Sequence, residues 1–136
     1  MKMLRGGCCC GAVEYEIRQL DSPIGHCSCH TCRKSHAAAF NTSAGVKHEN
    51  FRWVRGRDQL KAFESSPGKS RYFCSNCGSH LIAQRMGQDQ VILRVATLDD
   101  DPEQKPAFQI WKSHAVAWLE YGSHVPAYPE WQPGRL

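Results

Sequence analysis

The residues with the clearest chemical potential are eight cysteines, a high number for a chain of 136 residues. They fall into three clusters, which read Cys8-Cys9-Cys10, Cys27-Ser28-Cys29-His30-Thr31-Cys32 and Cys74-Ser75-Asn76-Cys77. Clustered thiols form disulfides, bind a metal ion or carry out redox chemistry. The first residues include a lysine and an arginine but no apolar run of the kind a secretory signal needs. We therefore expect a cytoplasmic protein whose cysteines bind metal.

The first and third clusters together predict a closed metal site. On a strand edge, Cys8 and Cys10 would project from one face and Cys9 from the other. Cys74 and Cys77 form a C-x-x-C-G turn, which can wrap two thiolates around one ion. Four thiolates at about 2.3 Å complete a tetrahedral structural zinc site. The alternatives are a chance C-x-x-C or a thioredoxin-like redox pair, but no βαβ pattern supports the redox interpretation.

The middle cluster supplies only three thiols, Cys27, Cys29 and Cys32. Three protein ligands with an open fourth position are typical of a reactive zinc site. The alternative is that His26, His30 or His36 completes a second structural site. The spacing alone leaves both interpretations open.

Length and charge set the broad class. A chain of this size, with 22% charged and 41% hydrophobic residues, fits one globular domain spanning residues 1–136. Its apolar runs are too short to cross a membrane. The net charge of +4 comes from cations scattered among acids, so nucleic acid is not an expected partner. The oligomeric state is left open.

Hydrophobic patterning predicts a mainly β protein. Val13, Tyr15 and Ile17 alternate within residues 11–17, which is typical of a strand with one buried face. A short helical turn is expected at 31–37 and a loop at 99–106. We predict that 51–54 and 59–63 form a hairpin, and that 71–74 and 81–83 flank the second cysteine turn. Further strands are predicted at 37–46, 91–95, 108–111 and 115–119.

The cysteine clusters belong to longer motifs. The opening reads Gly6-Gly7-Cys8-Cys9-Cys10-Gly11-Ala12-Val13-Glu14-Tyr15, and residues 27–34 read Cys27-Ser28-Cys29-His30-Thr31-Cys32-Arg33-Lys34. These motifs resemble the G-x-C-x-C-G-x-V-x-Y opening and the C-H-C-S-x-C-R-K box of the glutathione-dependent formaldehyde-activating family, whose domain centromere protein V shares. Residues 71–79 resemble R-x-F-C-x-x-C-G-S. Thr97-Leu98-Asp99-Asp100, Ile110-Trp111, Trp118 and the tail at 125–129 follow in order. Two departures are Ser28, at a position that the family does not use as a ligand, and Gln109, where a histidine is common.

The resemblance implies a zinc-stabilised β-tent of packed antiparallel sheets, related to methionine sulfoxide reductase B. It implies two zinc ions per chain, a structural one on Cys8, Cys10, Cys74 and Cys77 and a catalytic one on Cys27, Cys29 and Cys32. It also implies a carbon–sulfur lyase that joins formaldehyde and glutathione to S-hydroxymethylglutathione, or splits that adduct. The expected partners are therefore a small thiol such as glutathione and a small aldehyde.

Three thiolates around a divalent zinc leave a net charge of −1, so such a site suits binding a substrate thiol as its thiolate. Arg33, which follows the cluster directly, is a candidate contact for the glutathione carboxylates, and Arg71 is a further candidate cation. His30 is a candidate for proton transfer, and Phe108 and Trp111 are candidates for lining the pocket. Two roles are open for Cys9, which is either a buried apolar residue or an oxidation-sensitive thiol. The alternative function is a non-catalytic zinc module that recognises protein or nucleic acid.

Overall fold

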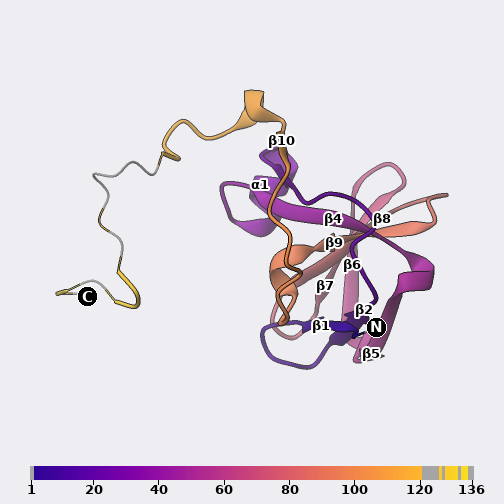
Figure 1. Cartoon of the computed structure of the whole chain (residues 1–136). Helices are drawn as coiled ribbons and strands as arrows, with labels where there is room; N and C mark the ends of the chain where they lie inside the picture. Colours follow the sequence, from indigo (N-terminus) through magenta and orange to yellow (C-terminus); the bar gives the residue numbers. More distant parts are fainter. Residues whose placement is uncertain (1, 121–125, 127, 132, 135–136) are drawn as a thin grey trace.

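The computed structural model describes residues 2–120, 126, 128–131 and 133–134. Within these residues the chain forms ten strands, one α-helix and four short 3-10 helices (Figure 1). In chain order they are β1 (Leu4–Gly7), β2 (Glu14–Ile17), β3 (Gly25–Cys27), α1 (His30–His36), β4 (Asn41–Lys47), η1 (His48–Asn50), β5 (Phe51–Arg55), η2 (Arg57–Gln59), β6 (Leu60–Ser66), β7 (Lys69–Cys74), β8 (His80–Arg85), β9 (Gln90–Arg94), η3 (Val95–Thr97), β10 (Phe108–Ile110) and η4 (Lys112–His114).

The strands form two sheets. The smaller sheet has the order β1-β2-β5, and the larger has the order β10-β3-β4-β9-β8-β7-β6. All paired neighbours are antiparallel except β10, which runs parallel to β3 at one edge of the larger sheet. The prediction of a mainly β fold is thus confirmed, with one mixed sheet.

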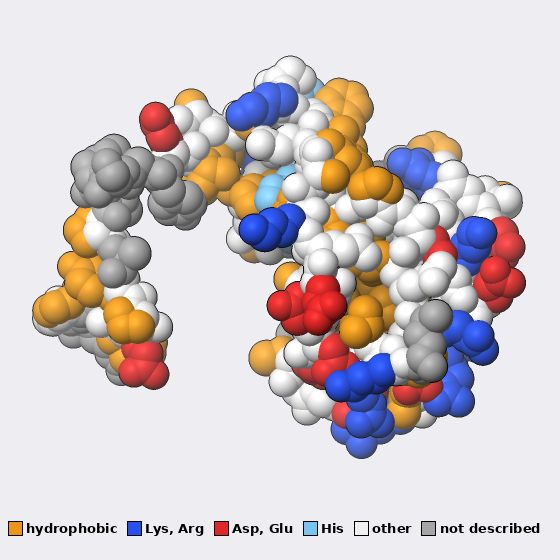
Figure 2. Space-filling view, in the orientation of Figure 1, with side chains coloured by type: hydrophobic (Ala, Val, Ile, Leu, Met, Phe, Trp, Pro, Cys, Tyr) orange, Lys and Arg blue, Asp and Glu red, His pale blue; other side chains and the backbone are white. Residues whose placement is uncertain are grey.

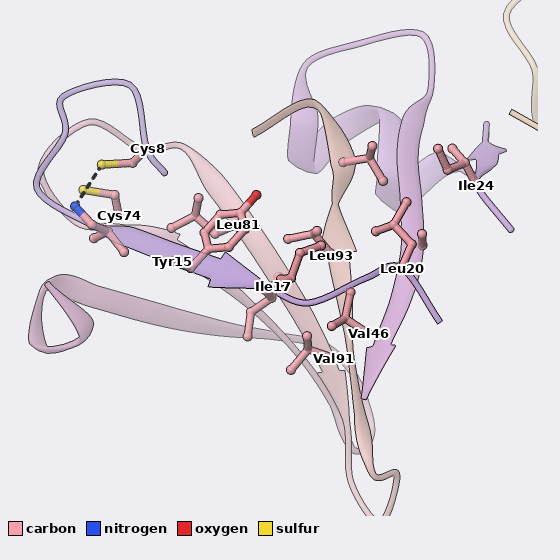
Figure 3. Packing of buried hydrophobic residues seen from close by; sticks show 14 residues of the cluster. Cys8, Tyr15, Ile17, Leu20, Ile24, Val46, Cys74, Leu81, Val91 and Leu93 are labelled. Carbon is pink, nitrogen blue, oxygen red and sulfur yellow. Dashed lines mark hydrogen bonds between the residues drawn. The ribbon is translucent and has the colours of Figure 1, made fainter. Parts of the chain in front are cut away.

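The hydrophobic core lies between the two sheets (Figure 3). Tyr15 and Ile17 of β2, and Val13 just before this strand, are each at most 1% exposed, as their alternation predicted. The larger sheet contributes Ala44, Val46, Leu81, Ile82, Val91 and Leu93. Each fully buried aliphatic side chain of this kind contributes about 1.5–3 kcal/mol. The core therefore fixes which face of the larger sheet is left for the site.

The other face of the larger sheet is polar and carries functional side chains. Residues that pair directly across two neighbouring strands have side chains on the same face of the sheet. Arg71 of β7 pairs with Ala83 of β8, and Arg94 of β9 pairs with Ser43 of β4. On β4, Asn41 pairs with Cys27 and lies on the same face as Ser43. Helix α1 lies against this face, because its Cys32 sulfur accepts hydrogen bonds from Asn41 and Arg71.

Helix α1 agrees with the predicted helical turn to within one residue. The N-cap is Cys29, whose Sγ accepts a hydrogen bond from the Cys32 amide at 3.3 Å. The helix ends at Ala37, which has a left-handed φ of 49° and donates its amide to the Arg33 carbonyl. The chain turns there, so the strand predicted for 37–46 begins only at Asn41.

The predicted hairpin of 51–54 with 59–63 is wrong. Both strands exist, but β5 pairs with β2 in the smaller sheet and β6 pairs with β7 in the larger one. Gly56 allows the change of direction, since it has a left-handed φ of 77° and a Cβ there would overlap the Ala12 carbonyl oxygen. The predicted pairing around the second cysteine turn is confirmed as β7 with β8.

The strand predicted at 115–119 is also wrong. These residues are irregular, and the chain leaves the larger sheet after η4 (Figure 1), so they have no neighbouring strand to bond. Of the motif at 125–129, residues 125 and 127 lie outside the described residues. No helix among the described residues is long and apolar enough to span a membrane. Acidic and basic side chains are interspersed on the face seen in Figure 2.

Candidate metal centres

Four cysteines from the first and third clusters meet at one end of the core. The Sγ atoms of Cys8, Cys10, Cys74 and Cys77 all lie within 4.8 Å of one another. The distance is 3.6 Å from Cys8 to Cys10 and 3.9 Å from Cys10 to Cys74. Tetrahedral zinc with bonds of about 2.3 Å requires sulfurs about 3.8 Å apart, so the donor set fits zinc. All eight cysteines are free thiols, which excludes disulfides in this structure.

Two short turns position these thiols. Residues 8–10 follow the end of β1 in a turn rather than on the strand edge expected from the sequence, and the Val13 amide donates to the Cys8 sulfur at 3.3 Å. In the second turn, Gly78 has a left-handed φ of 78° and donates its amide to the Cys74 carbonyl. Hydrogen bonds from Ser79 lower the pKa of Cys77 to about 5. Cys8 and Cys74 are buried against the core (Figure 3).

Cys9 takes no part in this cluster. Its side chain is exposed, which excludes the buried role considered for it, and its amide donates to the Ser79 hydroxyl at 3.0 Å.

The middle cluster brings together Cys27 at the end of β3, Cys29 at the helix N-cap and Cys32 on α1. Their three sulfurs lie within 4.8 Å of one another, and no histidine of the described residues joins them. The ring of His26 instead stacks on Phe40, with centroids 4.2 Å apart. The geometry of the described residues therefore gives a three-thiol set.

Cys27 and Cys32 differ in acidity. Burial raises the pKa of Cys32, but hydrogen bonds from Cys29, Arg71 and Cys27 outweigh it and lower that pKa to about 7. Burial and the neighbouring sulfurs raise the pKa of Cys27 to about 12. Cys32 thus ionises more readily than Cys27, and its sulfur carries negative charge more readily than the Cys27 sulfur.

Two buried arginines lie beneath the cluster. Arg71 is 2% exposed and Arg94 is 4% exposed. Arg71 donates to the Ser65 hydroxyl at 2.9 Å and to the Cys32 sulfur at 3.7 Å, while Arg94 donates to Asn41 and Ser43. Neither forms an ion pair with a carboxylate of the described residues. Since a buried charge needs a partner, the thiolates are the anions that balance these guanidinium groups.

A cavity of about 320 Å³ opens beside the three thiols. One wall is cationic and hydroxyl-bearing, and another is apolar and aromatic. The lining residues are Cys27, Cys29, His30, Thr31, Cys32, Ser65, Ser66, Lys69, Arg71, Arg85, Ile110, Trp111 and His114.

Three residues that we proposed from the sequence line the cavity, namely His30, Arg71 and Trp111. Phe108 lines a separate hollow with His26. Arg33 is not among the lining residues, and its Nε donates to the Ser28 carbonyl at 3.3 Å. Lys69 and Arg85 were missed, because they reach the cavity through the pairing of β7 with β8, which no cysteine spacing indicates.

The sheets and the two cysteine clusters define a mainly β protein with two candidate metal centres. The model of one family, the glutathione-dependent formaldehyde-activating enzymes, matches residues 3–114. The chain belongs to this family. It is also similar to the crystal structure of a protein from Rhodobacter sphaeroides, with a TM-score of 0.62 and 26% sequence identity over 76% of this chain and 98% of that one.

Proposed function

We propose that this protein is a zinc-dependent carbon–sulfur lyase or synthase that acts on the glutathione adduct of formaldehyde or of a similar small aldehyde. The observation that supports the proposal is the position of the three-thiol cluster, which faces a cavity large enough for a small molecule. A purely structural site would have no use for such an opening. Membership of the family supports glutathione and formaldehyde as the substrates.

Each cysteine cluster has a separate role in this proposal. Cys8, Cys10, Cys74 and Cys77 hold a structural zinc, because four thiolates complete a tetrahedral shell. Cys27, Cys29 and Cys32 hold the catalytic zinc. When bound there, zinc supplies positive charge that favours the thiolate form of a substrate thiol over the thiol.

The residues around the cavity position the substrate and move its protons. Arg71 and Asn41 hold the Cys32 sulfur by hydrogen bonds of 3.7 and 3.5 Å. Holding thiol and aldehyde together in one cavity supplies much of the acceleration expected for their addition. His30 and His114 line the cavity, and an imidazole there can accept and donate the thiol and hydroxyl protons.

Two-dimensional exchange NMR on mixtures of formaldehyde and glutathione tests this function directly. The zinc-loaded protein should increase the exchange rate between free glutathione and S-hydroxymethylglutathione above the uncatalysed rate. Cys29→Ser should abolish the increase, and Cys9→Ser should keep it because Cys9 lies outside both clusters. Rates equal to the uncatalysed background would contradict the enzyme proposal and favour a binding module.

Metal content provides an independent test of the two centres. Freshly purified protein should contain close to two zinc ions per chain by elemental analysis, given one cluster of four and one of three thiols. A value near one, with Cys27, Cys29 and Cys32 open to alkylation, would remove the catalytic centre. The predicted contact between Arg33 and a glutathione carboxylate also stays a proposal, and Arg33→Ala in the exchange assay tests it.

A further inference from the structure

One wall of the cavity beside the three thiols is built from cations that have no acidic partner. Lys69 and Arg71 come from β7, and Arg85 comes from the end of β8, where Arg85 pairs directly with Lys69. Ser65 and Ser66, at the end of β6, add two hydroxyl groups to the same wall. No aspartate or glutamate of the described residues lines the cavity.

Two of these cations have no carboxylate partner among the described residues. Arg71 is 2% exposed, and its Nη1 atom is buried without a hydrogen-bond partner. Burial, reinforced by Arg71 and Arg85, lowers the pKa of Lys69, although the Cys32 thiolate acts in the opposite direction. Neither Lys69 nor Arg71 forms an ion pair with a described carboxylate. A buried guanidinium group with an unpaired nitrogen favours an anion from solution in addition to the thiolates.

The charges of the cluster do not neutralise this wall. Three thiolates around a divalent ion carry a net charge of −1, and the buried pair Arg71 and Arg94 already outweighs it. Lys69 and Arg85 add further positive charge around the cavity. The electrostatics of the cavity therefore favour a ligand with more than one negative group.

We propose that Lys69, Arg71 and Arg85 form a carboxylate subsite that selects thiols carrying an acidic group. The thiol sulfur lies toward the three cysteines and the carboxylate lies against the cationic wall, with Ser65 and Ser66 as further donors. The apolar wall of Ile110 and Trp111 contacts the carbon chain between the two groups. This subsite rests on the proposed function for the identity of the reacting group, but it assigns the recognition of charge to residues that are not metal ligands.

Arg71 connects the two ends of this ligand. Its Nη2 atom donates to the Cys32 sulfur while its Nε donates to Ser65 on the cationic wall. The arginine is thus fixed between the thiol cluster and the carboxylate subsite. Its remaining nitrogen, Nη1, is the one without a partner.

Isothermal titration of the zinc-loaded protein with three small thiols tests the subsite. The probes are 3-mercaptopropionate, 2-mercaptoethanol and cysteamine, which are of similar size but carry an acid, a neutral and a basic group. We expect 3-mercaptopropionate to bind about tenfold more tightly than 2-mercaptoethanol, the scale of a hydrogen-bonded charge pair, and cysteamine to bind most weakly. Equal affinity for the three thiols would overturn the subsite.

Paired variants identify the residues responsible. The double variant Lys69→Met and Arg85→Met should reduce the preference for the acid to about twofold or less while keeping the affinity for 2-mercaptoethanol. The matched control, Lys47→Met with Lys61→Met, removes two exposed cations outside the cavity and should keep the full preference. A preference that survives loss of Lys69 and Arg85 would contradict the assignment. Zinc content and circular dichroism show whether each variant folds. Arg85→Met alone, at an exposed position, should lose part of the preference for the acidic thiol.

The outcome for the subsite can be separated from that of the proposed reaction, because binding does not require turnover. A charge preference without catalysed exchange would keep the subsite and remove the lyase. Catalysed exchange without a charge preference would keep the lyase and remove the subsite.

Discussion

The Nη2 atom of Arg71 lies 3.7 Å from the Sγ of Cys32 and donates a hydrogen bond to it, although the two residues are 39 positions apart in the sequence. This contact joins β7 to α1 across the polar face of the larger sheet. It also brings a buried positive charge beside Cys32, whose pKa is lowered to about 7. Arg71 therefore belongs to the candidate centre even though it is not a metal ligand.

Arg71→Met should weaken metal binding at the middle cluster selectively. Losing a hydrogen bond and a compensating charge next to a ligand typically costs about 10–100-fold in metal affinity. Competition with a chromophoric chelator should show this loss for one of two zinc ions, while the ion on the four-cysteine cluster keeps its affinity. Arg71→Lys retains the charge but not the paired donors, so it should give an intermediate value. Unchanged affinity in Arg71→Met would show that the contact has no influence on the metal.

The two clusters should differ in their effect on folding. Cys77→Ser removes a thiolate from the site at the end of the core, where zinc binding is coupled to the free energy of folding. We expect a loss of several kcal/mol in unfolding free energy, visible as a large fall in Tm. Cys29→Ser should instead give a folded protein with one zinc ion, because serine is a favoured N-cap and preserves the start of α1.

Cys9→Ser provides the control for this comparison, since Cys9 is exposed and outside both clusters. Its Tm and zinc content should match those of the unmodified protein. Equal falls in Tm for Cys77→Ser and Cys29→Ser would remove the distinction between structural and catalytic centres.

Local patterns were enough to predict most strands and the turn that carries Cys74 and Cys77. The alternation of Val13, Tyr15 and Ile17 marked a buried face, and the C-x-x-C-G spacing marked the turn at Cys74. Such signals lie within a few residues of each other, so no tertiary information is needed to interpret them. The relation to methionine sulfoxide reductase B, by contrast, stays a prediction.

Features that depend on distant segments could not be predicted in this way. The direction of the chain at Gly56 depends on the close approach of the Ala12 carbonyl. As a result, β5 and β6 belong to different sheets and do not pair as a hairpin. Similarly, Lys69 and Arg85 reach the cavity only because β7 and β8 pair in one particular register. Arg33 is adjacent to the cluster in sequence and its guanidinium bonds the Ser28 carbonyl, so its contact with a glutathione carboxylate stays a prediction.

Acid should destabilise the protein partly through His36. Burial, together with Arg94 and His80, lowers the pKa of His36 to about 3, against 6.5 for an ordinary histidine. Between these values the unfolded chain binds a proton that the folded one does not, so the free energy of unfolding falls as pH falls from 6.5 toward 3. His36→Phe should shrink the stability difference between pH 7.5 and pH 5.5 by about 0.5–1 kcal/mol, allowing for partial solvent screening.

Urea unfolding at the two pH values measures this effect, and zinc content must be determined in parallel because acid also protonates thiolates. The burial of His80 lowers its pKa in the same direction, so some pH dependence should persist in the variant. An identical loss of stability in both proteins would show that His36 makes no contribution.

The apolar wall of the cavity should depend on a glycine in the neighbouring strand. Gly25 of β3 pairs with Phe108 of β10, and a Cβ at Gly25 would overlap the Phe108 ring. We expect Gly25→Val to displace β10, which carries Ile110 and leads into Trp111, and so to weaken thiol binding without removing zinc. Hydrogen–deuterium exchange should show faster exchange of the Ala107 amide, which donates to the Ile24 carbonyl, and of the Ser28 amide, which donates to the Ile110 carbonyl. Adding Phe108→Ala makes room for the new side chain and should restore slow exchange, because Phe108 does not line the cavity itself. If the double variant exchanges as fast as Gly25→Val alone, the clash between these two residues does not control the position of β10.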